Sequence, residues 1–129
     1  MPISQVGLYL LLAIIVAVYI RRFLVARSVK QYSPVDASEA LRDAGSALLL
    51  DVRSDAERRA GSIKGSVHIP LHELEARAEE LRKHQDKEII CYCRSGNRSL
   101  HAAARLQKKG FKTANLKGGI AEWNFVYRG

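Results

Sequence analysis

The chain has 129 residues, of which 47% are apolar, and 21 basic against 13 acidic residues give a formal net charge of +8. This length is enough for one domain with a hydrophobic core. Much of the excess charge directly follows an apolar N-terminus, and no basic stripe with interleaved aromatic residues is present, so the composition argues against nucleic-acid binding.

The N-terminal segment, residues 2–20, contains no charged side chain. As a helix it would extend about 28 Å, close to the hydrocarbon thickness of about 30 Å, so we expect residues 1–26 to form a transmembrane anchor. A buried core helix and a cleaved signal peptide are the alternatives, but a signal peptide carries its basic residues before the apolar run. Here they follow it, as Arg21, Arg22, Arg27 and Lys30. The positive-inside rule then predicts a single-pass protein of the bacterial inner membrane, with the N-terminus outside and the remainder cytoplasmic.

A short polar linker is expected at residues 27–33, followed by a domain at 34–125 and a tail at 126–129. Val35 to Ala44 has helical spacing, and Gly45 provides a stop. Farther along, runs typical of strands alternate with runs typical of helices. This alternation predicts an α/β fold with a central parallel sheet flanked by helices, preceded by the one transmembrane helix.

The first predicted strand is the apolar run Ala47 to Val52, whose continuity is typical of a strand buried on both faces. Asp51 and Arg53 lie at its C-terminal end, where open α/β sheets bind ligands. We favour Asp51 as a structural acceptor for loop N–H groups. Arg53 is interpreted equally well as a surface charge or as a residue lining the mouth of a site.

A short helix is predicted at Asp55 to Ala60, ended by Gly61. Glu57 on this helix either pairs with an active-site arginine or is solvated, and we favour solvation. A short strand follows at Val67 to Ile69, where His68 is interpreted as structural rather than catalytic. Apolar residues at helical spacing, Leu71, Leu74, Ala78 and Leu81, then predict one amphipathic helix with a solvated acidic face.

The reactive segment begins after the predicted strand Glu88 to Tyr92 and leads into a helix at Ser99 to Lys109. Cys93 opens the loop between them, so it lies at the C-terminal end of a strand. Loop N–H groups and the N-terminus of the next helix would both favour a thiolate at this position, and Arg94 and Arg98 add two positive charges. Cys93 is therefore the candidate nucleophile, with a buried structural cysteine as the alternative.

The two cysteines, Cys91 and Cys93, are two positions apart in or next to one strand, so they lie on the same face in a geometry unsuited to a disulfide. This usage fits a reducing compartment. The pair and the scattered histidines offer too few ligands for zinc, so no metal site is expected. Downstream, a last strand is predicted at Phe111 to Lys117, and Gly118-Gly119 predicts a turn with close backbone approach.

Taken together, these motifs resemble the rhodanese family of single-domain sulfurtransferases over roughly residues 33–123. The resemblance rests on the ordered combination of the Cys93–Ser99 loop, Leu50–Arg53, Gly61–Ser66, Ile69–Pro70, Leu116–Ile120 and Trp123. Ser62 departs from the family, which usually has histidine there. By motif position, the substrate-binding loop comprises Arg94, Ser95, Gly96, Asn97, Arg98 and Ser99. Asp51 and Arg53 would support it.

The resemblance implies that Cys93 takes sulfane sulfur from a small anionic donor, thiosulfate or a persulfide, and passes it to a thiol, a protein acceptor or cyanide. The covalent persulfide is the intermediate, and no bound cofactor is expected. A membrane module that only relays or binds persulfide is the alternative. Cysteine phosphatases and arsenate reductases are a weaker one, because they carry Cys-x5-Arg, whereas Cys93 to Arg98 is the shorter Cys-x4-Arg.

Overall fold

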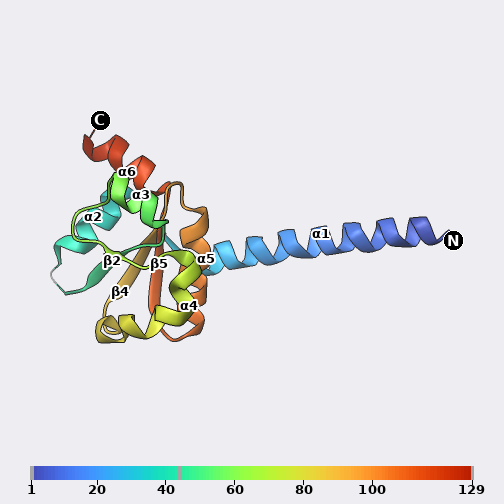
Figure 1. The fold of residues 1–129 in the computed structure, drawn as a ribbon, viewed down its shortest axis with the longest axis horizontal. Coiled ribbons are helices and arrows are strands. Elements are labelled where there is room, and N and C mark those ends of the chain that lie inside the picture. Colours follow the sequence, from blue (N-terminus) through green and yellow to red (C-terminus); the bar gives the residue numbers. More distant parts are fainter. Residues whose placement is uncertain (1, 44, 129) are drawn as a thin grey trace.

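The computed structural model describes residues 2–43 and 45–128. A long helix, α1 (Ile3–Ser28), extends away from an α/β domain (Figure 1). The expected end of a helix at Ala44 and the last tail residue, Gly129, lie outside the described residues, as does Met1 of the expected anchor.

Five strands form one parallel sheet in the order β1-β5-β4-β2-β3. They are β1 (Lys30–Tyr32), β2 (Ala47–Asp51), β3 (Val67–His68), β4 (Glu88–Tyr92) and β5 (Lys112–Leu116). The central strands β2 and β4 are mainly apolar runs of the sequence, which is the composition of strands covered on both faces. Strand β5 is more polar, but its last three residues are buried. The predicted α/β fold with a central parallel sheet flanked by helices is confirmed.

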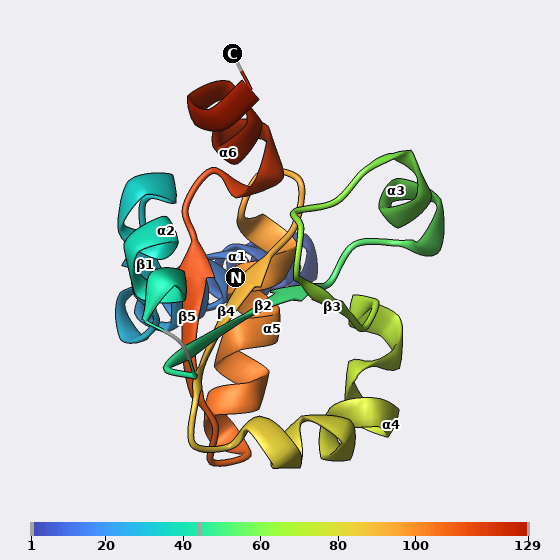
Figure 2. The same cartoon turned by 90° about the vertical axis from the view of Figure 1, so that its left-hand side faces the viewer.

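Helices cover both faces of this sheet (Figure 2). They are α2 (Pro34–Arg42), α3 (Asp55–Ala60), α4 (Leu74–Arg77), α5 (Asn97–Lys108) and α6 (Gly119–Arg128). The helix expected from Leu71 is divided into two 3₁₀ segments, Leu71–Glu73 and Ala78–His84, on either side of α4. The core-facing residues of this segment still recur every three or four positions. That spacing keeps them on one side of either an α-helix or a 3₁₀ helix.

Alternation along β4 divides the core into two halves. Ile89 and Cys91 face the half that includes α4 and α5, together with Cys93, whereas Ile90 and Tyr92 face the other half. All five are buried. Successive side chains of a strand point to opposite faces, so the two cysteines share one face as expected.

The segment 27–33, expected to be a polar linker, is structured. Helix α1 continues to Ser28, Val29 is buried in the core, and β1 pairs with β5 in parallel register. A three-residue polar strand at a sheet edge has too short a pattern to be predicted from periodicity. It is recognised only through its partner strand.

The expected tail also differs, because α6 continues through residues 126–128. Trp123 packs against the core half that contains Tyr92. Its ring lies 4.7 Å from that of Tyr127, one turn farther along α6. This aromatic contact at i, i+4 stabilises the end of α6 that lies beyond the core.

The position of Val29 predicts where the domain can be separated from α1. A chain beginning at residue 27 keeps Val29 and β1 and should fold, whereas one beginning at residue 34 loses both. Removing a buried valine costs about 1.5–3 kcal/mol, before the lost strand pairing is counted. Urea unfolding of the two truncated chains should show a clearly lower midpoint for the shorter one. Equal midpoints would contradict a structural role for β1.

Candidate active site

Cys93 lies at the C-terminal end of β4 and is almost completely enclosed, with only 1% of its surface exposed. The backbone N–H of Gly96 donates to its Sγ at 3.1 Å, and the Ser99 hydroxyl donates to the same atom at 3.4 Å. Gly96 adopts a φ of +104°, a conformation that glycine enters without strain and that turns the chain around the sulfur. The loop is therefore folded around the sulfur of Cys93.

These donors determine the ionisation of Cys93. Burial alone would raise the pKa of its thiol, but hydrogen bonds from the Ser99 hydroxyl and from the backbone N–H groups of Ser99, Gly96 and Ser95 outweigh burial and lower it. Burial raises the pKa of the neighbouring Cys91 to about 12. One of the two cysteines is thus prepared to be a thiolate, and the other remains an inert thiol.

The loop keeps this conformation because N–H groups at the start of α6 donate hydrogen bonds to its carbonyl oxygens. Ile120 N donates to Cys93 O at 2.9 Å, and Ala121 N donates to Arg94 O at 3.2 Å. A Cβ on Gly119 would lie 2.4 Å from Cys93 O, so only glycine permits this approach. The close backbone contact predicted for the double glycine is therefore a contact with the reactive loop.

Asn115 on β5 is a site residue that sequence reasoning missed. Its Oδ1 accepts a hydrogen bond from Ser99 Oγ at 2.6 Å, and its Nδ2 donates to Gly96 O at 3.1 Å and to Gln31 Oε1 at 2.9 Å. Asn115 thereby orients Gly96 and Ser99, the two residues that donate hydrogen bonds to the Cys93 sulfur. The available signal was weak: Asn115 lies between Ala114 and Leu116 near the end of a predicted strand, and a polar residue that is buried in such a strand needs partners.

Arg98 forms a bidentate ion pair with Glu57 of α3, at 2.7 and 2.8 Å. The favoured interpretation of Glu57 as merely solvated was wrong. The hydrogen bonds from Arg98 are the main reason that the pKa of Glu57 falls to about 2. Ser54 and Glu57 form a capping box, which directs Glu57 back toward the end of β2. The Ser-x-x-Glu spacing was the signal that could have indicated this.

The ion pair between Arg98 and Glu57 reduces the effect of the Arg98 charge on the Cys93 thiol. Arg98 is close enough to Cys93 for that sulfur to contribute to the raised pKa of the guanidinium, but Glu57 balances much of its charge. Hydrogen-bond donors of the loop, rather than the two arginines, are the main cause of the lowered Cys93 pKa. Arg94 and Asn97 are exposed, so they lie at the rim of the loop.

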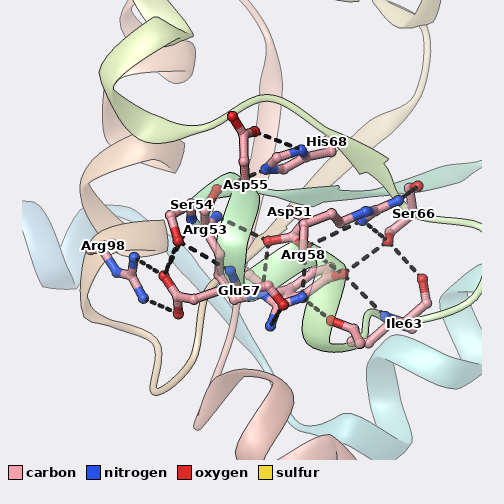
Figure 3. Close-up of polar contacts among 12 residues, drawn as sticks. Asp51, Arg53, Ser54, Asp55, Glu57, Arg58, Ile63, Ser66, His68 and Arg98 are labelled. Carbon is pink, nitrogen blue, oxygen red and sulfur yellow. Dashed lines mark hydrogen bonds and ion pairs between the residues drawn. The ribbon is translucent and has the colours of Figure 1, made fainter.

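Asp51 and Arg53 form a buried pair behind the site, as Figure 3 shows. Arg53 Nε and Nη2 donate to the two carboxylate oxygens at 3.0 and 2.9 Å, and Arg53 Nη2 also donates to Gly61 O at 2.6 Å. Arg53 is 5% exposed, so it is neither a surface charge nor a residue of an open mouth. The sequence could not indicate this burial, because Gly61 and the Tyr92 ring approach Arg53 only in the fold.

The carboxylate of Asp51 is a structural acceptor, in agreement with the favoured interpretation. It also accepts hydrogen bonds from Arg58 at 3.2 Å and from the Tyr92 hydroxyl at 3.1 Å. Burial would raise the pKa of Asp51, but the hydrogen bonds from Arg53 and Arg58 lower it below its ordinary value. His68 Nε2 contacts Arg53 O at 2.7 Å, which supports a structural role for this histidine (Figure 3).

Comparison with known proteins agrees with this geometry. The rhodanese-like domain family matches residues 33–125, so the chain belongs to that family. It is 39% identical over 87 residues to a sulfurtransferase of Allochromatium vinosum, covering 67% of this chain and 79% of that one. It is 42% identical over 90 residues to YrkF of Bacillus subtilis, whose name describes a sulfur carrier protein. The match covers 69% of this chain and 44% of that one.

Among solved structures, a rhodanese-related protein from Thermoplasma volcanium superposes with a TM-score of 0.69. The two chains are 31% identical, and the match covers 76% of this chain and 93% of that one. The domain is thus a rhodanese-like domain with relatives named as sulfurtransferases and sulfur carriers. Helix α1 precedes the matched residues.

The hydrogen bond from Ser99 predicts a pH effect. Ser99→Ala removes one donor that lowers the Cys93 pKa, so alkylation of Cys93, which requires the thiolate, should shift to higher pH. The change also leaves a buried oxygen of Asn115 without its partner, at a cost of about 1–3 kcal/mol in stability. Rates of iodoacetamide labelling against pH measure the shift. Ser95→Ala is the matched control, because its backbone N–H remains, and identical profiles for the two variants would contradict the assignment.

Proposed function

We propose that this protein is a membrane-anchored sulfurtransferase that moves sulfane sulfur through a persulfide on Cys93. The observation that carries the proposal is the enclosed Cys93 sulfur, which accepts hydrogen bonds from Gly96 and Ser99 at the C-terminal edge of the sheet. Membership of the rhodanese-like family and its sulfurtransferase-named relatives support the reaction class.

In the first step, the Cys93 thiolate attacks the outer sulfur of thiosulfate or of a persulfide donor. The bond between that sulfur and the donor breaks, and sulfite or the donor thiolate leaves with the bonding electrons. The product is a Cys93 persulfide anion. The loop N–H groups that lower the Cys93 pKa would stabilise this charge as well, because they surround the position of the sulfur.

In the second step, an acceptor thiolate or cyanide attacks the terminal sulfur of the persulfide. The S–S bond breaks, its electrons return to Cys93 as a thiolate, and the acceptor leaves as a persulfide or as thiocyanate. No bound cofactor is needed for either displacement. Exposed Arg94 is suited to hold an anionic donor at the rim, and Arg98, fixed by Glu57, is suited to order the loop.

A relay module that carries sulfur without turning over small substrates is the second candidate. The similarity to YrkF, whose name describes a sulfur carrier protein, favours this relay. Phosphatase or arsenate chemistry is less favoured, because an enclosed Cys-x4-Arg loop suits one added sulfur atom better than a tetrahedral oxyanion.

The central test is Cys93→Ser, which should abolish transfer because an oxygen cannot hold a transferable sulfane sulfur. Thiosulfate should add about 32 Da to the wild-type chain, and cyanide should remove it as thiocyanate. Cys91→Ala is the matched control, because it removes the other sulfur without burying a hydroxyl, and it should keep most of the activity. Intact mass spectrometry measures the adduct. Transfer by Cys93→Ser would refute the proposal, whereas loading without release to small acceptors would favour the relay.

The membrane location rests on α1. Ile3–Val25 is long and apolar enough to cross a membrane by length and composition, and its side chains lie on the surface of the structure. Four basic residues follow the charge-free segment, at Arg21, Arg22, Arg27 and Lys30. We infer one span in the bacterial inner membrane with the domain in the cytoplasm.

Reporter fusions test this orientation. A reporter active only in the cytoplasm should work after residue 129, and one active only in the periplasm should not. The same two reporters placed before residue 1 should give the opposite pattern, which controls for expression. A periplasmic signal from the C-terminal fusion would overturn the orientation.

A further inference from the structure

A basic cleft lies between the end of α1 and helix α5, separate from the Cys93 loop. Each helix contributes one face, with residues spaced i, i+3, i+4 and i+7. These residues are Val18, Arg21, Arg22 and Val25 from α1, and His101, Ala104, Arg105 and Lys108 from α5. The cleft has a volume of about 310 Å³, within the range of about 300–1,000 Å³ for small-ligand sites. Figure 1 shows α1 leaving the domain beside α5.

The lining of the cleft combines positive charge with apolar surface. Arg21, Arg22, Arg105 and Lys108 lie around Val18, Val25 and Ala104, and no acidic residue is among the described residues that line it. In the part of the chain that the structure describes, no ion pair involves any of these four cations. The next residue on α5, Lys109, differs, because it pairs with Glu75 at 3.0 Å. The cleft therefore holds a concentration of uncompensated positive charge.

The position of the cleft selects the chemistry of its ligand. Arg21 and Arg22 directly follow the charge-free segment 2–20, so in an inserted chain they lie at the level of the lipid headgroups. Arginine and lysine are the side chains that bind phosphate oxygens, and basic pockets beside transmembrane helices on the cytoplasmic side bind anionic headgroups. The apolar side chains suit the glycerol and acyl ends of the same molecule.

We propose that this cleft binds the headgroup of an anionic phospholipid and that the bound lipid holds α5 against the membrane. The proposal rests on the membrane anchoring proposed above, but it does not depend on sulfur transfer. The lipid phosphate would lie between arginines of the anchor and cations of the domain. It would thereby neutralise charges that α1 and α5 leave unpaired.

The test variant changes α5 alone, because the arginines of α1 also determine insertion. Arg105→Gln/Lys108→Gln removes two cations from the cleft, and both residues are exposed and lie outside the reactive loop. Lys83→Gln/Lys112→Gln is the matched control. It has the same change in net charge, at two exposed residues that do not line the cleft.

The full-length proteins are purified in dodecyl maltoside and titrated with phosphatidylglycerol or phosphatidylcholine, and bound lipid is counted by native mass spectrometry. Wild type and the control should retain one phosphatidylglycerol in preference to phosphatidylcholine. The cleft variant should bind phosphatidylglycerol about thirtyfold more weakly. This factor follows from a loss of about fivefold for each of the two cations removed near an anionic surface. Hydrogen exchange of residues 101–108 in lipid nanodiscs should slow with phosphatidylglycerol in wild type and in the control, but not in the cleft variant.

Equal retention by the cleft variant and the control, or equal binding of the two lipids, would refute the lipid site. Displacement of the lipid by inorganic phosphate alone would refute it also, and would indicate a site for free anions. Alkaline carbonate extraction of membranes and loading of Cys93 with sulfur are measured on the same proteins. A chain released by carbonate refutes the anchor and the lipid site together, whereas an inserted, sulfur-loading chain without lipid preference refutes only the lipid site.

Discussion

A peptide loop can direct its N–H groups at a buried sulfur only if its carbonyl groups are satisfied elsewhere. Here the N-terminus of α6 supplies that partner, because Ile120 N and Ala121 N bind the carbonyls of Cys93 and Arg94. The contact is close enough to exclude any side chain at Gly119. Asn115 satisfies a third carbonyl, that of Gly96. The lowered pKa of Cys93 therefore depends on groups that never touch its sulfur.

A second layer of polar contacts connects the reactive loop to the end of β2. Arg98 pairs with Glu57 at the loop, and Arg53 pairs with Asp51 beneath α3 (Figure 3). Buried charges are costly unless they are paired and hydrogen-bonded, and Asp51 meets this condition through three neighbours. Removing Asp51 would leave the buried guanidinium of Arg53 without its acidic partner, so we regard this layer as a rigid support for the loop.

The junction between α1 and the domain restricts how the domain can move. Only Val29 separates the end of α1 from β1, and it is buried in the core. An anchored chain of this kind would hold its domain in one orientation beside the membrane rather than on a flexible tether. A hollow lined by Tyr19, Phe23 and Arg98, among others, lies between α1 and the start of α5. The reactive loop and the proposed lipid cleft thus lie along one helix.

The sequence alone predicted the α/β class and the parallel sheet, which the structure confirms, and it placed Cys93 in a loop between a strand and a helix. Each is a local pattern: apolar runs, a glycine after a strand, and a helix start. It did not determine the roles of Glu57, Asn115 and Arg53, or the strand at Lys30–Tyr32. For Glu57, Asn115 and the strand at Lys30–Tyr32, the partners are distant in sequence. For Arg53 the acidic partner is near in sequence, but the burial that makes the pair structural arises only in the fold. Only the tertiary structure brings those partners together, so only it could assign them.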